Sequence, residues 1–196
     1  MRSRMNRTNG ILLCRSAMRL TSRLLCAGVL AAATAAHALD ALRGAPAISF
    51  DGKRLVQADQ GKTAVETWRE FLPPGDGFQR WTVLASIREY PGHDDPRALA
   101  GELVRALKRS TPDAPMSMIQ HPQTGDVIVD FITWPADRAF VEFNLFRYGK
   151  RPGGGVVAQQ YALRAYGDAS DFLRKLVTER PRLVDAMAKH GLQAAK

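Results

Sequence analysis

The residues of this chain best suited to chemistry are His93, Asp94 and Asp95, because all three side-chain types bind divalent metal ions or transfer protons. Glu142 would complete such a site if the fold brought it into the same cleft. An aspartate directly before Pro96, however, is also the ordinary cap of a helix N-terminus. The capping role is therefore favoured. A metal- or carboxylate-dependent hydrolase built on this cluster is kept as the alternative.

Four basic residues flank a glycine-rich segment. Arg147, Lys150 and Arg151 precede Gly153-Gly154-Gly155, and Arg164 follows it. A flexible, positively charged hairpin tip could hold an anionic ligand, a polymer or a lipid headgroup. The same pattern also fits solvated charges at the end of a hairpin. We predict that these four residues form the ligand-contacting surface.

The remaining motifs argue against the common catalytic classes. Gly61-Lys62-Thr63 has Val56 where a phosphate-binding loop needs a glycine. The chain contains no Gly-x-Ser-x-Gly segment to carry a hydrolase nucleophile. Trp68, Trp81 and Trp134 are more typical of a core or a sheet edge than of a binding platform. We therefore expect no cofactor.

The elements that must position these residues centre on the stretch from Asp126 to Tyr166. Its period-2 alternation of β-branched and aromatic residues predicts three long strands. They span residues 126–134, 140–148 and 156–166. Short connections favour antiparallel neighbours. Glu142 and Asn144 fall on the opposite face from the apolar residues beside them, so that face is expected to be wet or to line a cleft.

The preceding half contributes shorter strands and one helix. Strands are predicted at residues 48–56, with a turn at Asp51-Gly52, and at 64–72, 81–90 and 116–120. Between the last two, Leu99, Leu103 and Leu107 recur every four residues. Asp94 or Asp95 caps this amphipathic helix, and Thr111-Pro112 ends it.

Two helices are predicted after the last strand. Asp168 caps the first, Asp171 stands at the capping-box position, and residues 172, 173, 176 and 177 form its apolar stripe. The second runs from Pro181 to His190 and ends at Gly191. The fold class is therefore α+β: a single antiparallel β-sheet covered by an amphipathic helix and a C-terminal helical pair.

The N-terminal segment has the composition of an export signal. Residues 1–38 contain six arginines and no acidic residue, then a short apolar run that ends in Ala36-His37-Ala38. A basic region, a hydrophobic region and an Ala-x-Ala site are typical of a secretory signal peptide. We expect cleavage near Leu39, leaving a single domain at residues 39–196 without a transmembrane segment. Met18 is an alternative start.

Charge and cysteine content depend strongly on this segment. The chain has 28 basic and 19 acidic residues, but without the six leader arginines 22 basic residues remain, a net charge of +3. The basic character therefore gives no reason to expect nucleic acid as a partner. Both cysteines also lie in the leader, which excludes disulfide and thiol chemistry in the remaining domain.

Two resemblances bear on the fold. Residues 70–78, EFLPPGDGF, followed by Trp81-Thr82, and the strands VDFITWP and VEFNLFRY resemble small, uncharacterised secreted bacterial proteins. The order strands, helix, strands, helix is similar to that of the small α/β sandwiches of the PsbP, Mog1 and DcrB type. The second resemblance implies a fold alone, because fold does not imply function.

Since no catalytic constellation is complete, the sequence favours a non-catalytic role. We expect an exported, periplasmic or secreted binding or envelope-accessory domain. Its partner would be an envelope protein or an anionic ligand.

Overall fold

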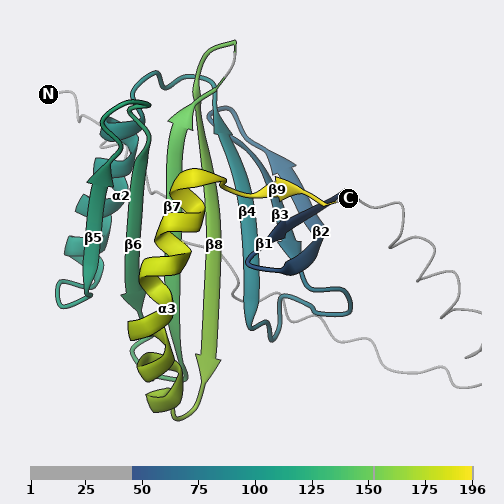
Figure 1. The fold of residues 1–196 in the computed structure, drawn as a ribbon, viewed down its shortest axis with the longest axis vertical. Helices are drawn as coiled ribbons and strands as arrows, with labels where there is room; N and C mark the ends of the chain where they lie inside the picture. The colour runs from purple at the N-terminus through teal and green to yellow at the C-terminus, as the bar shows by residue number, and fades with distance from the viewer. Residues whose placement is uncertain (1–45, 152, 196) are drawn as a thin grey trace, which may run out of the picture.

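A computed structural model describes residues 46–151 and 153–195 (Figure 1). The predicted signal peptide, residues 1–38, lies outside the described residues. Within them the chain is α+β and forms one antiparallel sheet of nine strands, in the order β5-β6-β7-β8-β4-β3-β2-β1-β9. The predicted fold class is confirmed to this extent.

The first half of the sheet contains β1 (Ala47–Phe50), β2 (Lys53–Lys62), β3 (Thr67–Leu72) and β4 (Val83–Tyr90). The second half contains β5 (Met116–Gln120), β6 (Val127–Thr133), β7 (Phe140–Lys150) and β8 (Val156–Tyr166). Helix α2 (Pro96–Ser110) connects the halves, and α3 (Ser170–Lys189) leads to β9 (Gln193–Ala194).

Helix α2 forms as its sequence predicts. The carboxylate of Asp95 accepts a hydrogen bond from the backbone N of Arg97 at 2.8 Å, which satisfies one of the free N–H groups of the first turn. Leu99, Leu103 and Leu107 are buried. They pack on the face of the sheet that carries Val127, Val129 and Phe131 of β6.

The predicted C-terminal helical pair is wrong, because α3 is one continuous helix that contains Pro181. A proline removes one backbone hydrogen bond and normally breaks a helix. Here the carbonyl that loses its partner belongs to Val177, whose side chain is 76 % exposed, so water can solvate this part of the helix. Leu176 and Leu183, on either side of the proline, are both buried and hold the two halves on the sheet.

The start of α3 also differs from the prediction. The carboxylate of Asp168 does accept from the backbone N of Ser170 at 2.9 Å. Asp171, however, makes an ion pair with Arg174 instead of closing a capping box. Leu173 is exposed like Val177, so only part of the predicted apolar stripe faces the core.

The two helices cover opposite faces of the second half of the sheet (Figure 1). The α3 face packs Leu176, Leu183 and Met187 against Ile128 and Phe143. Ile128 and Phe143 alternate along β6 and β7 with side chains that point to the opposite face. Helix α2 packs against those side chains, which include Val127, Val129 and Tyr148. Both faces of β6 and β7 are therefore covered. Among the described residues, no helix combines the length and hydrophobicity needed to cross a membrane.

The sheet consists of two meanders joined along one pair of strands. β1 to β4 are neighbours in chain order, and so are β5 to β8. The two blocks meet where β4 pairs with β8, from Val83 opposite Leu163 to Tyr90 opposite Val156. Helix α2 carries the chain from this junction to β5 at the edge of the sheet.

Candidate functional site

A cleft of about 320 Å³ lies between the C-terminal half of α2 and the face of the sheet formed by β6, β7, β8 and β4. The buried side chains of Leu103 and Leu107 form its wall on the helix. Trp134, in the connection between β6 and β7, borders it as well. The volume falls at the lower end of the ~300–1,000 Å³ typical of small-molecule sites.

The apolar floor of the cleft is a row of three aromatic rings. Phe131 stacks on Phe146 with ring centroids 5.9 Å apart and planes inclined by 10°. Phe146 stacks in turn on Tyr148 at 5.8 Å and 15°. Strand alternation produces this row, because Phe146 and Tyr148 are two residues apart on β7 and therefore share a face. Such a surface suits a flat ring or a short hydrocarbon chain.

A chain of polar side chains crosses the same face from β4 to β7. Ser86 Oγ donates to Gln160 Oε1 at 3.0 Å, and Gln160 Nε2 donates to Asn144 Oδ1 at 2.7 Å. Asn144 Nδ2 then donates to Glu142 Oε1 at 2.8 Å. All four residues are buried. We call these four residues the polar relay. Each member has a partner, as buried polar groups require.

Arg164 binds the second carboxylate oxygen of Glu142, the residue at the end of the polar relay. Its Nε donates to Glu142 Oε2 at 2.9 Å. The guanidinium lies 3.8 Å from the ring centroid of Trp81 and 4.0 Å from that of Phe140. Two aromatic faces and a carboxylate thus fix its position and neutralise its charge.

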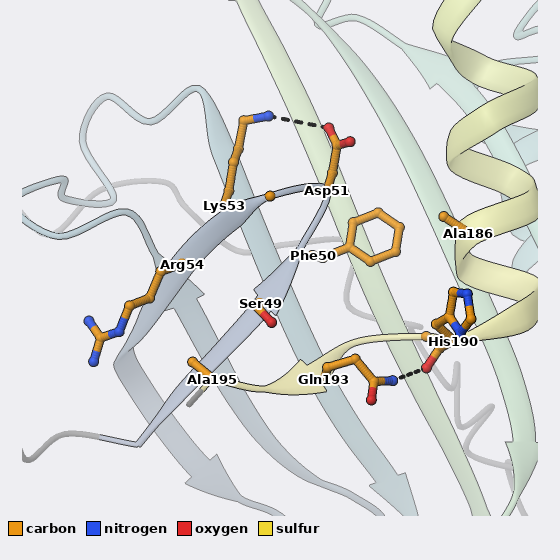
Figure 2. A pocket seen from close by; sticks show the side chains of 11 residues that line it. Ser49, Phe50, Asp51, Lys53, Arg54, Ala186, His190, Gln193 and Ala195 are labelled. Carbon is orange, nitrogen blue, oxygen red and sulfur yellow. Dashed lines mark hydrogen bonds and ion pairs between the residues drawn. The ribbon is translucent and has the colours of Figure 1, made fainter.

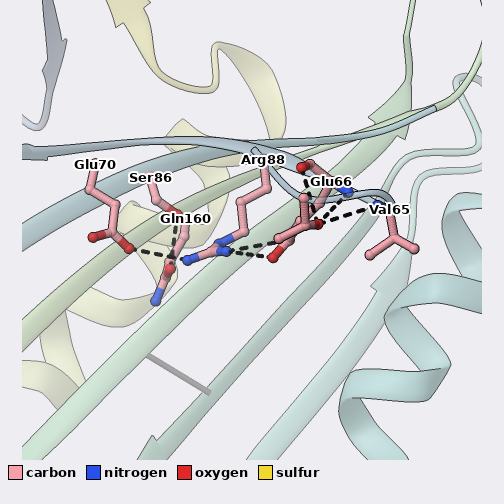
Figure 3. A network of polar contacts seen from close by, with 7 residues as sticks. Val65, Glu66, Glu70, Ser86, Arg88 and Gln160 are labelled. Carbon is pink, nitrogen blue, oxygen red and sulfur yellow. Dashed lines mark hydrogen bonds and ion pairs between the residues drawn. The ribbon is translucent and has the colours of Figure 1, made fainter. Parts of the chain in front are cut away.

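A second arginine on this face is held by two carboxylates of β3 and the segment before it. Figure 3 shows Arg88 of β4 with Glu66 on one side and Glu70 on the other, next to Ser86 and Gln160. The Arg88–Glu66 and Arg88–Glu70 contacts are 3.3 and 3.1 Å long. Burial raises the pKa of the Glu70 carboxyl, and the lowering effect of Arg88 does not cancel this.

The tyrosines at the cleft are neutral hydroxyl groups. Burial raises the pKa of Tyr90, and the charge of Glu66 raises it further. Burial likewise raises the pKa of Tyr148. Neither phenol can therefore act as an ionised base near neutral pH. These two phenols offer the cleft hydrogen bonds and aromatic surface.

The structure does not bring the predicted acid-base cluster to this cleft. Asp95 caps α2, and the His93 ring packs edge-on against Tyr90 at 5.9 Å. Asp94 and Asp95 line a separate hollow that also contains Lys150. Glu142 lies in the cleft instead, so the expected convergence is wrong. No group of three or more His, Cys, Asp or Glu side chains within residues 46–151 and 153–195 could hold a metal ion.

The four basic residues predicted to surround the glycine-rich tip do not form one cluster. Arg164 is paired in register with Glu142, whereas the tip residue Lys150 is paired with Val156 at the other end of the hairpin. The prediction counted residues along the chain, but the antiparallel register places Arg164 eight residues down β8 from the tip.

The other arginines of that set have structural partners. Arg147 binds Asp126 at 2.7 Å and donates to the carbonyl of Met187 at 3.2 Å, so its positive charge lies at the C-terminal end of α3. Arg151 pairs with Glu89 at 3.3 Å. Residues 153–155 form the expected hairpin turn, with all three glycines at positive φ.

Gly61 and Lys62 are the last residues of β2, paired with Trp68 and Thr67 of β3, and Thr63 begins the turn that the sequence predicts between the two strands. Thr63 Oγ1 accepts from the backbone N of Val65 at 3.2 Å and of Glu66 at 3.1 Å. This geometry is that of a hydroxyl-stabilised turn, which has no phosphate-binding role.

A second hollow, of about 410 Å³, lies where the β1–β2 turn meets the end of α3 and β9 (Figure 2). Asp51 faces Lys53 there at 3.3 Å and also pairs with Arg182. Burial opposes ionisation of Asp51, but hydrogen bonds from Arg182 and Lys53 lower the pKa of its carboxyl overall. The charges pair with one another, as in an ordinary surface ion-pair group.

Sequence reasoning placed Glu142 and Asn144 on a face that lines a cleft, and they do line one. It missed Ser86, Arg88 and Gln160. The available signal was that Ser86 and Arg88 are two residues apart in a predicted strand and therefore share a face. What the sequence lacked was the pairing of β4 with β8, which sets Ser86 opposite Gln160.

The fold and the cleft define a single-sheet α+β protein with a small, mixed polar and aromatic site. A family model matches residues 44–192, and the chain belongs to that family. No curated protein matches the chain.

Proposed function

We propose that this protein is an exported, non-catalytic binding domain that takes a small amphipathic molecule into the cleft between α2 and the sheet. The observation that carries the proposal is the juxtaposition of the stacked rings of Phe131, Phe146 and Tyr148 with the polar relay. Binding sites for small molecules combine apolar surface with a few placed polar groups in this way.

The polar groups support binding rather than catalysis. Ser86, which could serve as a nucleophile, donates its proton to the amide oxygen of Gln160, and the carboxylate opposite it on β3, Glu70, is bound to Arg88. Both carboxylate oxygens of Glu142 are already engaged within the protein, Oε1 by Asn144 and Oε2 by Arg164. The proposal therefore replaces the hydrolase alternative built on His93, Asp94 and Asp95.

Export is part of the same proposal and rests on the sequence of residues 1–38. The arginine-rich start, the apolar run and the Ala36-His37-Ala38 site support a cleaved signal peptide and a periplasmic or secreted location. The resemblance of residues 70–78 to small secreted bacterial proteins supports the same location.

Binding of a hydrophobic fluorescent probe, N-phenyl-1-naphthylamine, tests the proposal. The wild-type protein should bind it and enhance its fluorescence. Phe146→Ala removes the middle ring of the floor and should weaken binding by at least about tenfold, the loss of one well-packed anchor. The variant Lys150→Ser/Arg151→Ser is the matched control, because it alters the glycine-rich tip and leaves the cleft intact.

The two variants also separate the cleft from the tip as the binding surface. If the tip variant binds the probe more weakly and Phe146→Ala binds it as tightly as the wild type, the proposal is overturned. The basic tip would then be the binding surface. Circular dichroism and thermal unfolding of each variant must show a folded protein before affinities are compared.

A further inference from the structure

We infer that the ligand of the cleft is an uncharged molecule whose polar group is a hydrogen-bond acceptor, such as a ketone, ester or amide carbonyl. The inference rests on the proposed function and specifies its ligand class. It replaces the anionic ligand that the basic residues near the hairpin tip first suggested.

The charges around the cleft do not favour an anion. Its two arginines are already engaged, Arg164 by Glu142 and Arg88 by both Glu66 and Glu70. All five side chains are at most 15 % exposed. An anionic group in the cleft would meet Glu142 and two guanidinium groups that carboxylates already neutralise, Arg164 by Glu142 and Arg88 by Glu66 and Glu70. It would have to displace one carboxylate, and a buried charge without its partner is strongly unfavourable.

The relay leaves hydrogen-bond donors at the cleft. A primary amide nitrogen carries two N–H groups. Gln160 uses one on Asn144, and Asn144 uses one on Glu142. Within residues 46–151 and 153–195, the second N–H of each amide has no hydrogen-bond acceptor. The amide oxygens already accept within the relay, from Ser86 and Gln160.

Because the unpaired N–H groups of Asn144 and Gln160 are buried, they indicate where a ligand would place a hydrogen-bond acceptor. Asn144 is 3 % exposed and Gln160 8 % exposed, and both line the cleft. A buried donor without a partner costs about 1–3 kcal/mol, so a carbonyl oxygen bound there would satisfy groups that water reaches poorly. The ligand should therefore place its acceptor at these two amides and its ring or hydrocarbon body on the row from Phe131 to Tyr148.

Three naphthalene probes that share one ring system test the inference by isothermal titration calorimetry on the exported protein. 2-Acetylnaphthalene carries a neutral acceptor, 2-naphthoate carries a negative charge, and 2-ethylnaphthalene carries neither. The acetyl compound should bind most tightly. The naphthoate should bind at least about tenfold more weakly because of the carboxylates, and the ethyl compound about three- to tenfold more weakly because the donors stay unpaired.

One variant tests whether the carbonyl oxygen of the ligand binds at Gln160. Gln160→Glu replaces the donating amide with a carboxylate of the same shape and should remove the preference for 2-acetylnaphthalene over 2-ethylnaphthalene. Gln60→Glu, an exposed change on β2, is the control and should leave the preference intact. The comparison of the three probes on the wild-type protein stands even if Gln160→Glu does not fold.

The outcomes separate this inference from the proposed function. Naphthoate binding as tightly as the acetyl compound would overturn the neutral ligand class and leave the binding function standing. Equal affinity for the ethyl and acetyl compounds would overturn the inference that the ligand carries a hydrogen-bond acceptor. Failure of all three probes to bind would overturn the proposed function and this inference with it.

Discussion

Glu142 and Arg164 face each other across β7 and β8, with Arg164 Nε 2.9 Å from Glu142 Oε2. Their side chains are only 11 % and 10 % exposed. The arginine also lies between the rings of Trp81 and Phe140. This pair therefore connects the polar relay to the aromatic packing beside the cleft.

Breaking this pair should strongly destabilise the domain. Glu142→Ala leaves the guanidinium of Arg164 buried without a partner, and we expect a loss of about 3–5 kcal/mol in the free energy of unfolding. Urea denaturation measures it. The control is Asp185→Ala, which removes a 2.9 Å pair with Lys189 whose side chains are about 60 % exposed. That change should cost less than about 0.5 kcal/mol. Equal effects would contradict the buried character of the Glu142 pair.

Leu103 is a core residue between α2 and the sheet, so its truncation should destabilise the domain. It is 4 % exposed and packs in the cluster with Leu107 and Phe131. Leu103→Ala should lower the free energy of unfolding by about 2–5 kcal/mol, as large-to-small core changes do. Lys108→Ala, on the exposed side of the same helix, is the control for helix content. An unchanged melting temperature for Leu103→Ala would mean that α2 does not pack in this orientation.

Pro181 distinguishes one helix from two. In a continuous α3, Pro181→Ala allows a backbone hydrogen bond to the carbonyl of Val177 and should raise stability by about 2–2.5 kcal/mol. This is the helix-interior cost of proline, ~3 kcal/mol, less the greater freedom of the unfolded chain. At the first position of a separate helix, the same change would be neutral or destabilising. Thermal and urea unfolding decide between the two.

Glu70 should make stability depend on pH. Because its folded-state pKa is raised, this carboxyl contributes stability that is fully present below its ordinary pKa of about 4.5 and is lost as pH rises through the raised value. Glu70→Gln removes that loss, so the variant should gain stability over the wild type as the pH rises above about 4.5. Glu179→Gln, an exposed change on α3, should show no such gain. A wild type that gains relative to Glu70→Gln as pH rises would contradict the raised pKa.

Export and cleavage can be measured directly. The mature protein should begin near Leu39 and contain no cysteine, because Cys14 and Cys26 both precede that position. Intact mass of the exported form checks this. A product that retains residues 1–38, or one that carries a lipid, would contradict the predicted signal peptide.

Local patterns predicted most of the individual elements. The alternation in residues 126–134, 140–148 and 156–166 corresponds to β6, β7 and β8, and the leucine spacing corresponds to α2. Pro181 misled the prediction, because a proline is read as a break unless the packing on both sides of it is known. Leu176 and Leu183 supply that packing, and it depends on where the sheet lies.

The candidate site was only partly predictable, because it depends on which strands are neighbours. Alternation alone placed Glu142 and Asn144 on one face. The partners of these residues come from β8 and β4, and the pairing of β4 with β8 skips over all of β5, β6 and β7. The prediction of one basic cluster was wrong for the same reason. The four residues are near the glycines in sequence, but the strand register separates Arg164 from the tip.

The junction of β4 with β8 makes this domain a candidate for fragment complementation. Each block is a meander of consecutive strands, and the connection at Gly92 between β4 and α2 is exposed. A chain cut there would yield two pieces whose complementary edges carry the eight residue pairs from Val83 opposite Leu163 to Tyr90 opposite Val156. In the intact protein, the first block must keep the edge of β4 unpaired until β8 has emerged, which exposes that strand to mispairing during synthesis.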